Sequence, residues 1–368
     1  MNPKVTFIVP CYKLAHLLPD CINSILTQTF GDFEVLIMDD ASPDNTPEVA
    51  ASFTDPRVRH IRNQPNLGHL RNYNKGIGLS RGEYVWLISA DDYLHRPYVL
   101  QRYVDLMDAH PEVGFVFCPG VKVRNGQEIE TLGYSLQGGN DRICNGRKFL
   151  TKLIRANTIV AASGMVRKIC YDSISVFPLD MPWGGDWYLW CVFSLAADVG
   201  YFAEPMVCYR EHDLSMTTKL MKDDVDQCSR EDITMPWIIK RKVKEAGYPY
   251  LVKACLDSAA HEYSRRIATK RYKSAAPSMT LEQFEQSLCN STSDENERRW
   301  VRARVYADLA DLHYWRHENS LAHQFYTLAL RTDRRMPSIW IKRLLLAAGD
   351  AGDWIRRGRA RLHHRAAN

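Results

Sequence analysis

The stretch YVWLISADDYLHRP, residues 84–97, decides how the first half of this sequence folds. It begins with an apolar run rich in branched and aromatic residues, which is typical of a buried strand. It then has two adjacent acids, and a proline follows a few residues later. The stretch VLIMDDASPD, residues 35–44, repeats this order of an apolar run and two acids. We therefore expect two buried strands that each end at a pair of carboxylates.

Five short apolar runs in the first half are predicted to be strands because of their length and their Val, Ile and aromatic content. They are Val5–Val9, Val35–Met38, Val58–Ile61, Tyr84–Ser89 and Val113–Cys118. Segments with helical spacing of apolar residues separate them, for example residues 17–26 and the segment that opens at Pro97. This alternation predicts an α/β fold with a mostly parallel central sheet flanked by helices on both faces.

The two acidic pairs, Asp39-Asp40 and Asp91-Asp92, should lie at the same edge of this sheet. Ligands of such sheets bind beyond the carboxyl ends of the strands. Adjacent carboxylates repel each other unless a cation or hydrogen-bond donors compensate. A hard divalent cation, Mg²⁺ or Mn²⁺, prefers oxygen ligands and commonly bridges carboxylates to substrate phosphates. The alternative is that Asp40 and Asp44 only shape a turn and cap a helix, and for Asp44 we favour that reading.

Composition places the chain among ordinary globular proteins. Its 368 residues are 45% apolar and 25% charged, enough for one large domain or two smaller ones. None of the ten cysteines forms a C-x-x-C pair, which argues against a zinc ribbon or a thioredoxin-type site. Scattered cysteines and an N-terminus unlike a signal peptide favour a cytoplasmic location. No run approaches the roughly 20 apolar residues of a membrane span.

Three regions are expected along the chain. Residues 1–220 should form the α/β domain, residues 221–290 a helical extension, and residues 291–368 a helical hairpin with a basic tail, packed on the main domain. The hairpin turn is placed at residues 317–319, and Ser274–Thr280 is expected to be a linker. A single helical pair cannot form a solenoid.

The basic tail is the strongest charge asymmetry in the sequence. Residues 331–368 contain ten Lys or Arg and three Asp, a net charge of +7, whereas the whole chain carries +5. Such a tail suits an anionic surface, either lipid head groups or nucleic acid, although a solvated helix face is the simpler alternative. Because Trp340, Ile341 and Leu344 stand among the basic residues, we favour an anionic membrane over nucleic acid.

Several motifs in succession resemble family-2 glycosyltransferases of the GT-A fold. They are VPCYK at 9–13, MDDASPDNT at 38–46, NLGHLRNYNKGI at 66–77, SADDYLHRP at 89–97 and HPEVGFVF at 110–117. The resemblance covers roughly residues 4–120, with a further piece near 183–216. It implies an inverting transfer of a sugar from a nucleotide-diphosphate sugar to an acceptor hydroxyl, in polysaccharide or glycoconjugate assembly.

The resemblance also implies the roles of the donor-binding residues. Pro10 and Tyr12 would lie against the base, and Asp39 would accept a hydrogen bond from the ring N–H of uracil or thymine. Asp40 and Asn66 belong to the same nucleotide-binding set. Arg71 would pair with the base or the diphosphate, and Asp91 would hold the ribose or the sugar.

The divalent cation, Mn²⁺ or Mg²⁺, is assigned to Asp92 by the same resemblance. Ser89 stands where many relatives have a further Asp, so metal binding rests more heavily on Asp92. His212, in the segment YREHDLS at 209–215, would reach the diphosphate or serve as another metal ligand; a structural role is the alternative.

The acceptor side of the site is assigned to PWGGDWYLW at 182–190. Asp186 would be the general base that deprotonates the acceptor hydroxyl, a role worth roughly 10²–10⁴ in rate. The simpler alternative is a helix N-cap, which would also keep the carboxylate ionised. Trp183 is the candidate acceptor contact, although tryptophans at such positions are as often core.

Other functions are weighed against this one. The sequence has no P-loop, no complete dinucleotide fingerprint, no G-x-S-x-G and no H-E-x-x-H. A sugar-phosphate nucleotidyltransferase would share the sheet and the metal but should have a glycine- and lysine-rich loop after the first strand. A non-catalytic nucleotide-sugar-binding scaffold is the remaining alternative.

Overall fold

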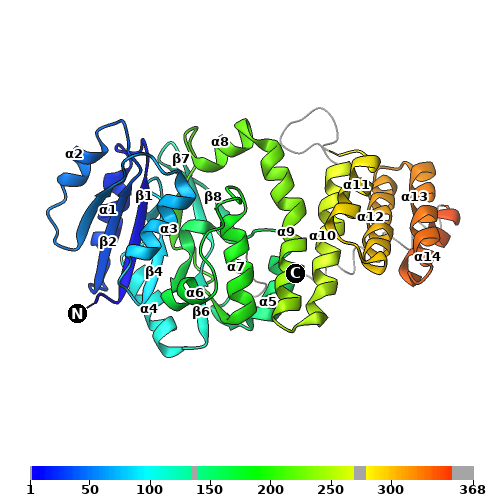
Figure 1. Cartoon of the computed structure of the whole chain (residues 1–368), viewed down its shortest axis with the longest axis horizontal. Helices are drawn as coiled ribbons and strands as arrows, with labels where there is room; N and C mark the ends of the chain where they lie inside the picture. The colour runs from blue at the N-terminus through cyan, green and yellow to red at the C-terminus, as the bar shows by residue number, and fades with distance from the viewer. Residues whose placement is uncertain (1, 134–138, 269–278, 350–368) are drawn as a thin grey trace. The chain divides into compact units, whose positions relative to one another are not determined.

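The computed structural model describes residues 2–133, 139–268 and 279–349 and divides into two compact units, Met1–Cys228 and Ser229–Asn368 (Figure 1). The first unit contains an eight-stranded sheet of order β3-β2-β1-β4-β10-β6-β11-β9. Its strands are β1 Val5–Cys11, β2 Phe33–Asp39, β3 Val58–Arg62, β4 Tyr84–Leu87, β6 Val113–Phe117, β9 Arg142–Cys144, β10 Met165–Arg167 and β11 Asp198–Tyr201.

All five predicted strands lie in this sheet, and the mostly parallel arrangement is confirmed. β1 is parallel to both β2 and β4, and β2 is parallel to β3. The unpredicted β10 runs antiparallel between β4 and β6. Because β10 has only three residues, it carries no recognisable alternation of apolar and polar residues.

A second, four-stranded sheet of order β5-β12-β7-β8 lies in the same unit. Its strands are β5 Tyr93–Leu94, β7 Gly120–Arg124, β8 Gln127–Leu132 and β12 Val207–Arg210. Asn125 and Gly126 join β7 to β8 with positive φ angles of 51° and 76°, as expected of an Asn-Gly hairpin turn. Because β5 follows Asp92 directly and pairs with β12, this sheet brings the chain near residue 210 to the second acidic pair.

From β1 to β4, one helix separates each pair of successive strands, as expected. The helices of the first unit are α1 Leu18–Leu26, α2 Thr46–Ala51, α3 His69–Leu79, α4 Val99–Ala109, α5 Gly146–Leu153, α6 Lys168–Ser173, α7 Gly185–Ala196 and α8 Met216–Asp223. α9, Val225–Glu245, follows. The helix predicted to open at Pro97 begins two residues later, at Val99.

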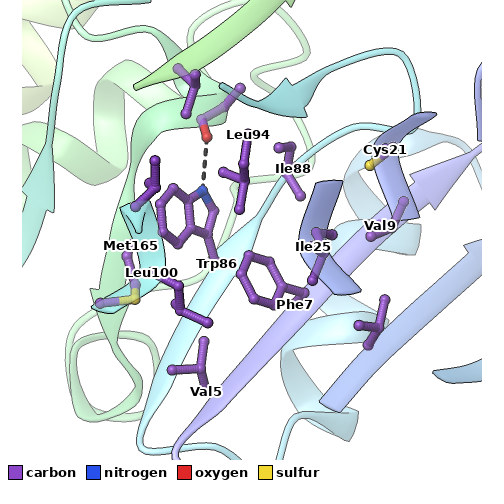
Figure 2. Close-up of a cluster of buried hydrophobic side chains, with 14 of the residues drawn as sticks. Val5, Phe7, Val9, Cys21, Ile25, Trp86, Ile88, Leu94, Leu100 and Met165 are labelled. Carbon is purple, nitrogen blue, oxygen red and sulfur yellow. Dashed lines mark hydrogen bonds between the residues drawn. The ribbon is translucent and has the colours of Figure 1, made fainter. Parts of the chain in front are cut away.

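The core of the main sheet is centred on Trp86 of β4, which has no solvent exposure. Its ring lies 4.4 Å from the ring of Tyr103 and 5.5 Å from that of Phe7, centroid to centroid. The indole N–H donates to the carbonyl oxygen of Ala162 at 2.8 Å, so this large buried side chain leaves no unpaired polar atom (Figure 2). The packing fixes β4, and therefore the acids that follow it.

α3 lies unusually close to β1 because of Gly76. A Cβ atom built on Gly76 would stand 2.6 Å from Cγ2 of Ile8. Asn72, one turn earlier, donates from Nδ2 to the carbonyl oxygen of Met38 at 2.9 Å. These contacts hold α3 against β1 and β2 beside the sheet edge that carries the acids.

The second unit is helical in its described part. Its helices after α9 are α10 Val252–Ala268, α11 Leu281–Ser291, α12 Glu295–Trp315, α13 Asn319–Thr332 and α14 Pro337–Ala347. The predicted hairpin is α12 and α13, and His317 in its turn has a φ of 61°. The predicted linker lies mostly outside the described residues, which resume at residue 279. No helix in the described ranges is both long and apolar enough to cross a membrane.

The apolar spacing in α13 predicts a buried face of Leu321, Phe325 and Leu328, but the hairpin packs largely through smaller residues. Leu321 and Leu328 of α13 are 40% and 38% exposed. The core instead contains Ala322, Tyr326 and Ala329. On α12 it contains Ala303, Ala307 and Ala310. Small side chains let two helices approach closely, so apolar size alone did not identify the buried face.

We predict that Gly76→Ala destabilises the protein by about 1–3 kcal/mol, because the new methyl group overpacks the contact with Ile8. Gly78→Ala in the same helix is the matched control, since a Cβ there meets nothing within 4 Å. Ala also favours a helix over Gly, so the control should be neutral or stabilising. Urea unfolding of both variants measures the difference, and equal stabilities would contradict the close approach of α3.

Candidate active site

The two acidic pairs meet at one edge of the main sheet. Asp39 ends β2 opposite Cys11 of β1, and the backbone N–H of Asp40 donates to the carbonyl oxygen of Cys11 at 3.0 Å. On the other side of β1, the N–H of Ala90 donates to the carbonyl oxygen of Pro10 at 3.1 Å. The end of β1 therefore lies between Asp39-Asp40 and Asp91-Asp92.

The first pair is fully engaged in hydrogen bonds. Asp39 is completely buried; its Oδ1 accepts from the N–H of Ser42 at 2.8 Å and its Oδ2 from Arg62 Nη1 at 2.7 Å. Asp40 accepts from the N–H groups of Leu67 and Gly68 at 2.8 and 2.9 Å. Hydrogen-bond donors, not a cation, therefore compensate these two charges.

Asp40 shapes the loop that carries Asn66. Besides the two loop N–H groups, its carboxylate accepts from Asn63 Nδ2 at 2.8 Å, and Asn66 Nδ2 donates to its backbone carbonyl at 2.6 Å. Gly68, the residue before α3, has a φ of 80° that favours glycine. In this conformation Asp40 positions the loop and the start of α3.

The second pair, Asp91-Asp92, has fewer hydrogen-bond donors around it. Asp91 Oδ2 lies 2.9 Å from Nε2 of His212, whereas Asp91 Oδ1 is buried without a hydrogen-bond partner among the described residues. Asp92 Oδ1 accepts from the backbone N–H of Arg210 at 2.9 Å. Burial, and then the charge of Asp91, raises the pKa of Asp92 well above its ordinary value.

These observations test whether a divalent cation fits. An unpaired buried carboxylate oxygen, a second acid and an imidazole are suitable ligands. The described residues contain no group of three or more His, Cys, Asp or Glu side chains that could hold a metal ion unaided. The fit is therefore to a cation that takes its other ligands from a bound phosphate group and water.

A pocket of about 650 Å³ lies beside this pair. His16 and Asp20 line it from the α1 side, and Tyr93, Arg210 and His212 line it from the small sheet. The Arg210 guanidinium pairs with Asp20 at 3.1 Å. The pocket gives a polar ligand access to the residues around Asp91 and Asp92.

Asp186 lies in the first turn of α7 and is only partly buried. Its Oδ1 accepts from the N–H of Trp187 at 2.7 Å and its Oδ2 from Asn157 Nδ2 at 2.9 Å. Burial raises the pKa of this carboxyl, although both hydrogen bonds lower it. The N-cap alternative is wrong, because Gly184 is the N-cap residue.

Tyr73 of α3 packs against the segment that precedes Asp186, with its ring 5.3 Å from that of Phe177. Burial raises the pKa of the Tyr73 phenol, and the charges of Asp91, Asp186 and Asp92 raise it further. Nothing in the motifs pointed to Tyr73, although it directly follows the Arg71-Asn72 pair.

The remaining predicted residues lie around this edge. Pro10 is buried near the end of β1, and Tyr12 just beyond it is 39% exposed. Asn66 and Arg71 are exposed, and no described residue pairs with the Arg71 guanidinium. Trp183 is partly exposed.

Trp187 and Asn157 both lie near Asp186, but only Asn157 binds its carboxylate through a side chain. Trp187 is buried and donates from Nε1 to the carbonyl of Leu153 at 2.9 Å, so it belongs to the core. Asn157 was not anticipated, because it lies 29 residues away in the sequence and no pattern links it to Asp186.

We predict that Asp92→Asn raises the thermal stability of the free protein at about pH 8. Folding raises the pKa of Asp92, so ionisation of this carboxyl favours the unfolded state. The resulting loss of folding stability develops as the pH rises above the ordinary pKa of an aspartate and is absent below it. Each kcal/mol removed should raise Tm by about 2–4 °C. The gain should shrink as the pH approaches 4, whereas the exposed control Asp105→Asn should show no such trend. A gain independent of pH would contradict the buried, ionised state of Asp92.

Comparisons with known proteins show what the chain resembles. The family model "Glycosyl transferase family 2" matches residues 6–167. The chain is 38% identical over 96 residues to the uncharacterized glycosyltransferase EpsJ of Bacillus subtilis, covering 26% of this chain and 28% of that one. It is 39% identical over 107 residues to the succinoglycan biosynthesis protein ExoO of Rhizobium meliloti, covering 29% and 30%.

Solved structures share the fold over more of the chain. S. aureus TarS 1–349, in complex with UDP-GlcNAc, superposes with a TM-score of 0.60 at 17% identity, covering 90% of this chain and 88% of that one. The GT-A fold class is thereby confirmed, while the two curated relatives are matched over only about 30% of their lengths. Residues 6–167 thus match the family-2 glycosyltransferase model, and the chain shares the fold of the TarS structure.

Proposed function

We propose that this protein is a glycosyltransferase that moves a sugar from a nucleotide-diphosphate sugar to an acceptor hydroxyl group. The observation that carries the proposal is the second acidic pair at the sheet edge, in which Asp91 Oδ1 is buried without a partner among the described residues, together with Asp186 in the first turn of α7. Two carboxylates for a cation and diphosphate and a third for a base are what a direct displacement needs.

The donor is proposed to be UDP- or dTDP-linked. Tyr12 is exposed beside the end of β1, where a base can stack on it. Arg71 presents a guanidinium that pairs with none of the described residues and that suits a diphosphate. Asp39 would accept from the base only by sharing the oxygen that now accepts from Arg62. UDP-GlcNAc in the TarS structure is consistent with a UDP-linked donor.

A divalent cation, Mn²⁺ or Mg²⁺, would be held by Asp92 and Asp91 with His212 beside them, and would neutralise the leaving diphosphate. His212 would orient Asp91 through their 2.9 Å contact. The unpaired Oδ1 of Asp91 is then explained as an oxygen that gains a partner on donor binding.

In the proposed reaction Asp186 removes the proton of the acceptor hydroxyl as its oxygen attacks the anomeric carbon. The bond from that carbon to the diphosphate breaks on the opposite face, so the configuration is inverted. A raised pKa makes Asp186 a stronger base than an ordinary aspartate. Trp183, partly exposed near Asp186, is proposed to contact the acceptor.

We predict that Asp186→Asn lowers transfer by about 10²–10⁴-fold, because the amide cannot accept the proton. The side-chain oxygen of the asparagine can still accept the hydrogen bond from the N–H of Trp187, so the affinity for the nucleotide-sugar should change little. The measurement is a mass-spectrometric screen of UDP- and dTDP-sugars with Mn²⁺, followed by calorimetry. Asp172→Asn, an exposed acid paired with Lys168, is the control. Transfer at the wild-type rate would remove Asp186 as the base.

The same screen separates the alternatives. A binding scaffold would bind the nucleotide-sugar without transfer or hydrolysis by the wild type. A nucleotidyltransferase would instead consume a sugar phosphate and a nucleoside triphosphate. The name of ExoO supports an acceptor in polysaccharide assembly, which remains part of the proposal.

We further propose that the C-terminal part of the second unit lies on an anionic membrane, close to a lipid-linked acceptor. One face of α14 exposes Trp340, Ile341 and Leu344, by 42%, 46% and 67%. Ile339 on another face is buried in the helical core. An exposed apolar stripe with a net charge of +7 over residues 331–368 suits an interfacial helix. The arginines from Arg356 onward lie outside the described residues.

We predict that Trp340→Ala with Leu344→Ala weakens binding to phosphatidylglycerol-containing vesicles by at least about tenfold, since each buried apolar side chain contributes on the order of 1.5–3 kcal/mol. Vesicle flotation measures it, with pure phosphatidylcholine vesicles and added salt testing the electrostatic part. Ile129→Ala, which removes a 53% exposed apolar side chain of β8, is the control. Equal vesicle binding by the two variants would exclude α14 as the surface of the protein that binds the membrane.

A further inference from the structure

A second pocket, of about 820 Å³, lies in the helical unit between α9 and α11, and we call it the α9–α11 pocket. Its described lining residues on α9 run from Thr234 to Glu245, and those on α11 run from Gln283 to Ser291. Within each helix they recur at helical spacing, so one face of each helix forms a wall. None of these residues belongs to the candidate active site. The volume is within the range of about 300–1,000 Å³ that is typical of ligand pockets.

The lining of the α9–α11 pocket has more cationic than acidic side chains. Lys240, Arg241 and Lys244 are the cations, and Glu245 is the acid among the described lining residues. Glu297 of α12 holds the ammonium groups of both lysines, at 2.5 and 2.9 Å. Even with this second acid included, the cations outnumber the acids. An ammonium group has three N–H donors, so each lysine can also donate to an anionic ligand.

Amide and hydroxyl side chains form the largest part of the lining. Gln286 and Asn290 of α11 are exposed and present their amides. The hydroxyl groups of Ser287 and Ser291 lie 3.1 and 3.2 Å from the hydroxyl group of Tyr263 on α10, which holds them in place. Amides and hydroxyls both donate and accept hydrogen bonds, as the hydroxyl groups of a saccharide do.

Trp237 is the aromatic residue among the described lining residues. It is 8% exposed and packs in the helical core with Tyr263 and Phe284. Its indole N–H is buried without a hydrogen-bond partner among the described residues, which is costly, and an acceptor atom of a bound ligand would offset that cost. A single-stranded nucleic acid is a poorer match, because its bases stack on exposed aromatic side chains.

We propose that the α9–α11 pocket binds an acidic oligosaccharide, whose carboxylates pair with the lining cations and whose hydroxyl groups bond to the lining amides. This inference goes beyond the proposed function, because it assigns a second saccharide site to residues other than those of the candidate active site. Such a site would hold an acidic glycan on the protein whether or not a donor is bound.

The test is calorimetry on the full chain with a tetramer of galacturonic acid, compared with neutral maltotetraose and with a single-stranded oligothymidylate. Lys244→Gln removes a lining cation and Gln286→Ala removes a lining amide, and both side chains are exposed. Each change should weaken binding of the acidic tetramer by about three- to tenfold, the usual worth of one hydrogen bond. Lys242→Gln is the matched control, because this lysine of the same helix pairs with Glu245 and does not line the pocket.

Binding of the acidic tetramer that exceeds binding of maltotetraose, and that Lys244→Gln weakens while Lys242→Gln does not, supports the inference. Failure of the acidic tetramer to bind, or equal binding of maltotetraose, overturns it. Equal losses in Lys244→Gln and Lys242→Gln also overturn it, because net charge alone would then account for the attraction. Tighter binding of oligothymidylate assigns the pocket to nucleic acid instead. None of these outcomes depends on sugar transfer, which the donor screen measures separately.

Discussion

The buried carboxylates of Asp91 and Asp92 are the constraint on which the rest of the site depends. Ionised side chains are costly to bury, and two in succession repel each other as well. The protein supplies one backbone N–H to Asp92 and one imidazole to Asp91, and one oxygen stays without a partner. The strand before these acids, β4, is anchored in the core by Trp86 and its neighbours. Core packing thus holds the site in an electrostatically unfavourable state that a cationic ligand would relieve.

In the first acidic pair, by contrast, hydrogen-bond donors compensate the buried charges. Asp39 and Asp40 also follow a buried strand, but side-chain and backbone donors surround them. The consequence is structural: Asp40 fixes the loop before α3, and α3 then spans the distance to the segment before Asp186. Asn72 binds the sheet, whereas Asn74 on the next part of the helix binds Phe177. One short helix therefore connects the sheet edge that carries the acids to the segment before Asp186.

Much of this arrangement could be predicted from the sequence, because local patterns control it. Apolar runs of four to six residues identified β1, β2, β3, β4 and β6, and their alternation with helices implied their parallel order. The positions of the acids at strand ends followed directly. β10 and β9 could not be predicted, since strands of three residues depend on the neighbours that they pair with. The buried face of α13 was also missed, because alanines that allow close packing carry little hydrophobic signal.

The sequence by itself determined which residues carry charge at the edge of the sheet and which family's motifs they belong to. Only the tertiary structure decided how each charge is compensated, because that depends on donors distant in the chain: Arg62 for Asp39, His212 for Asp91 and Asn157 for Asp186. Local composition fixes a strand or a helix, whereas the partners of a polar group are fixed by how those elements pack.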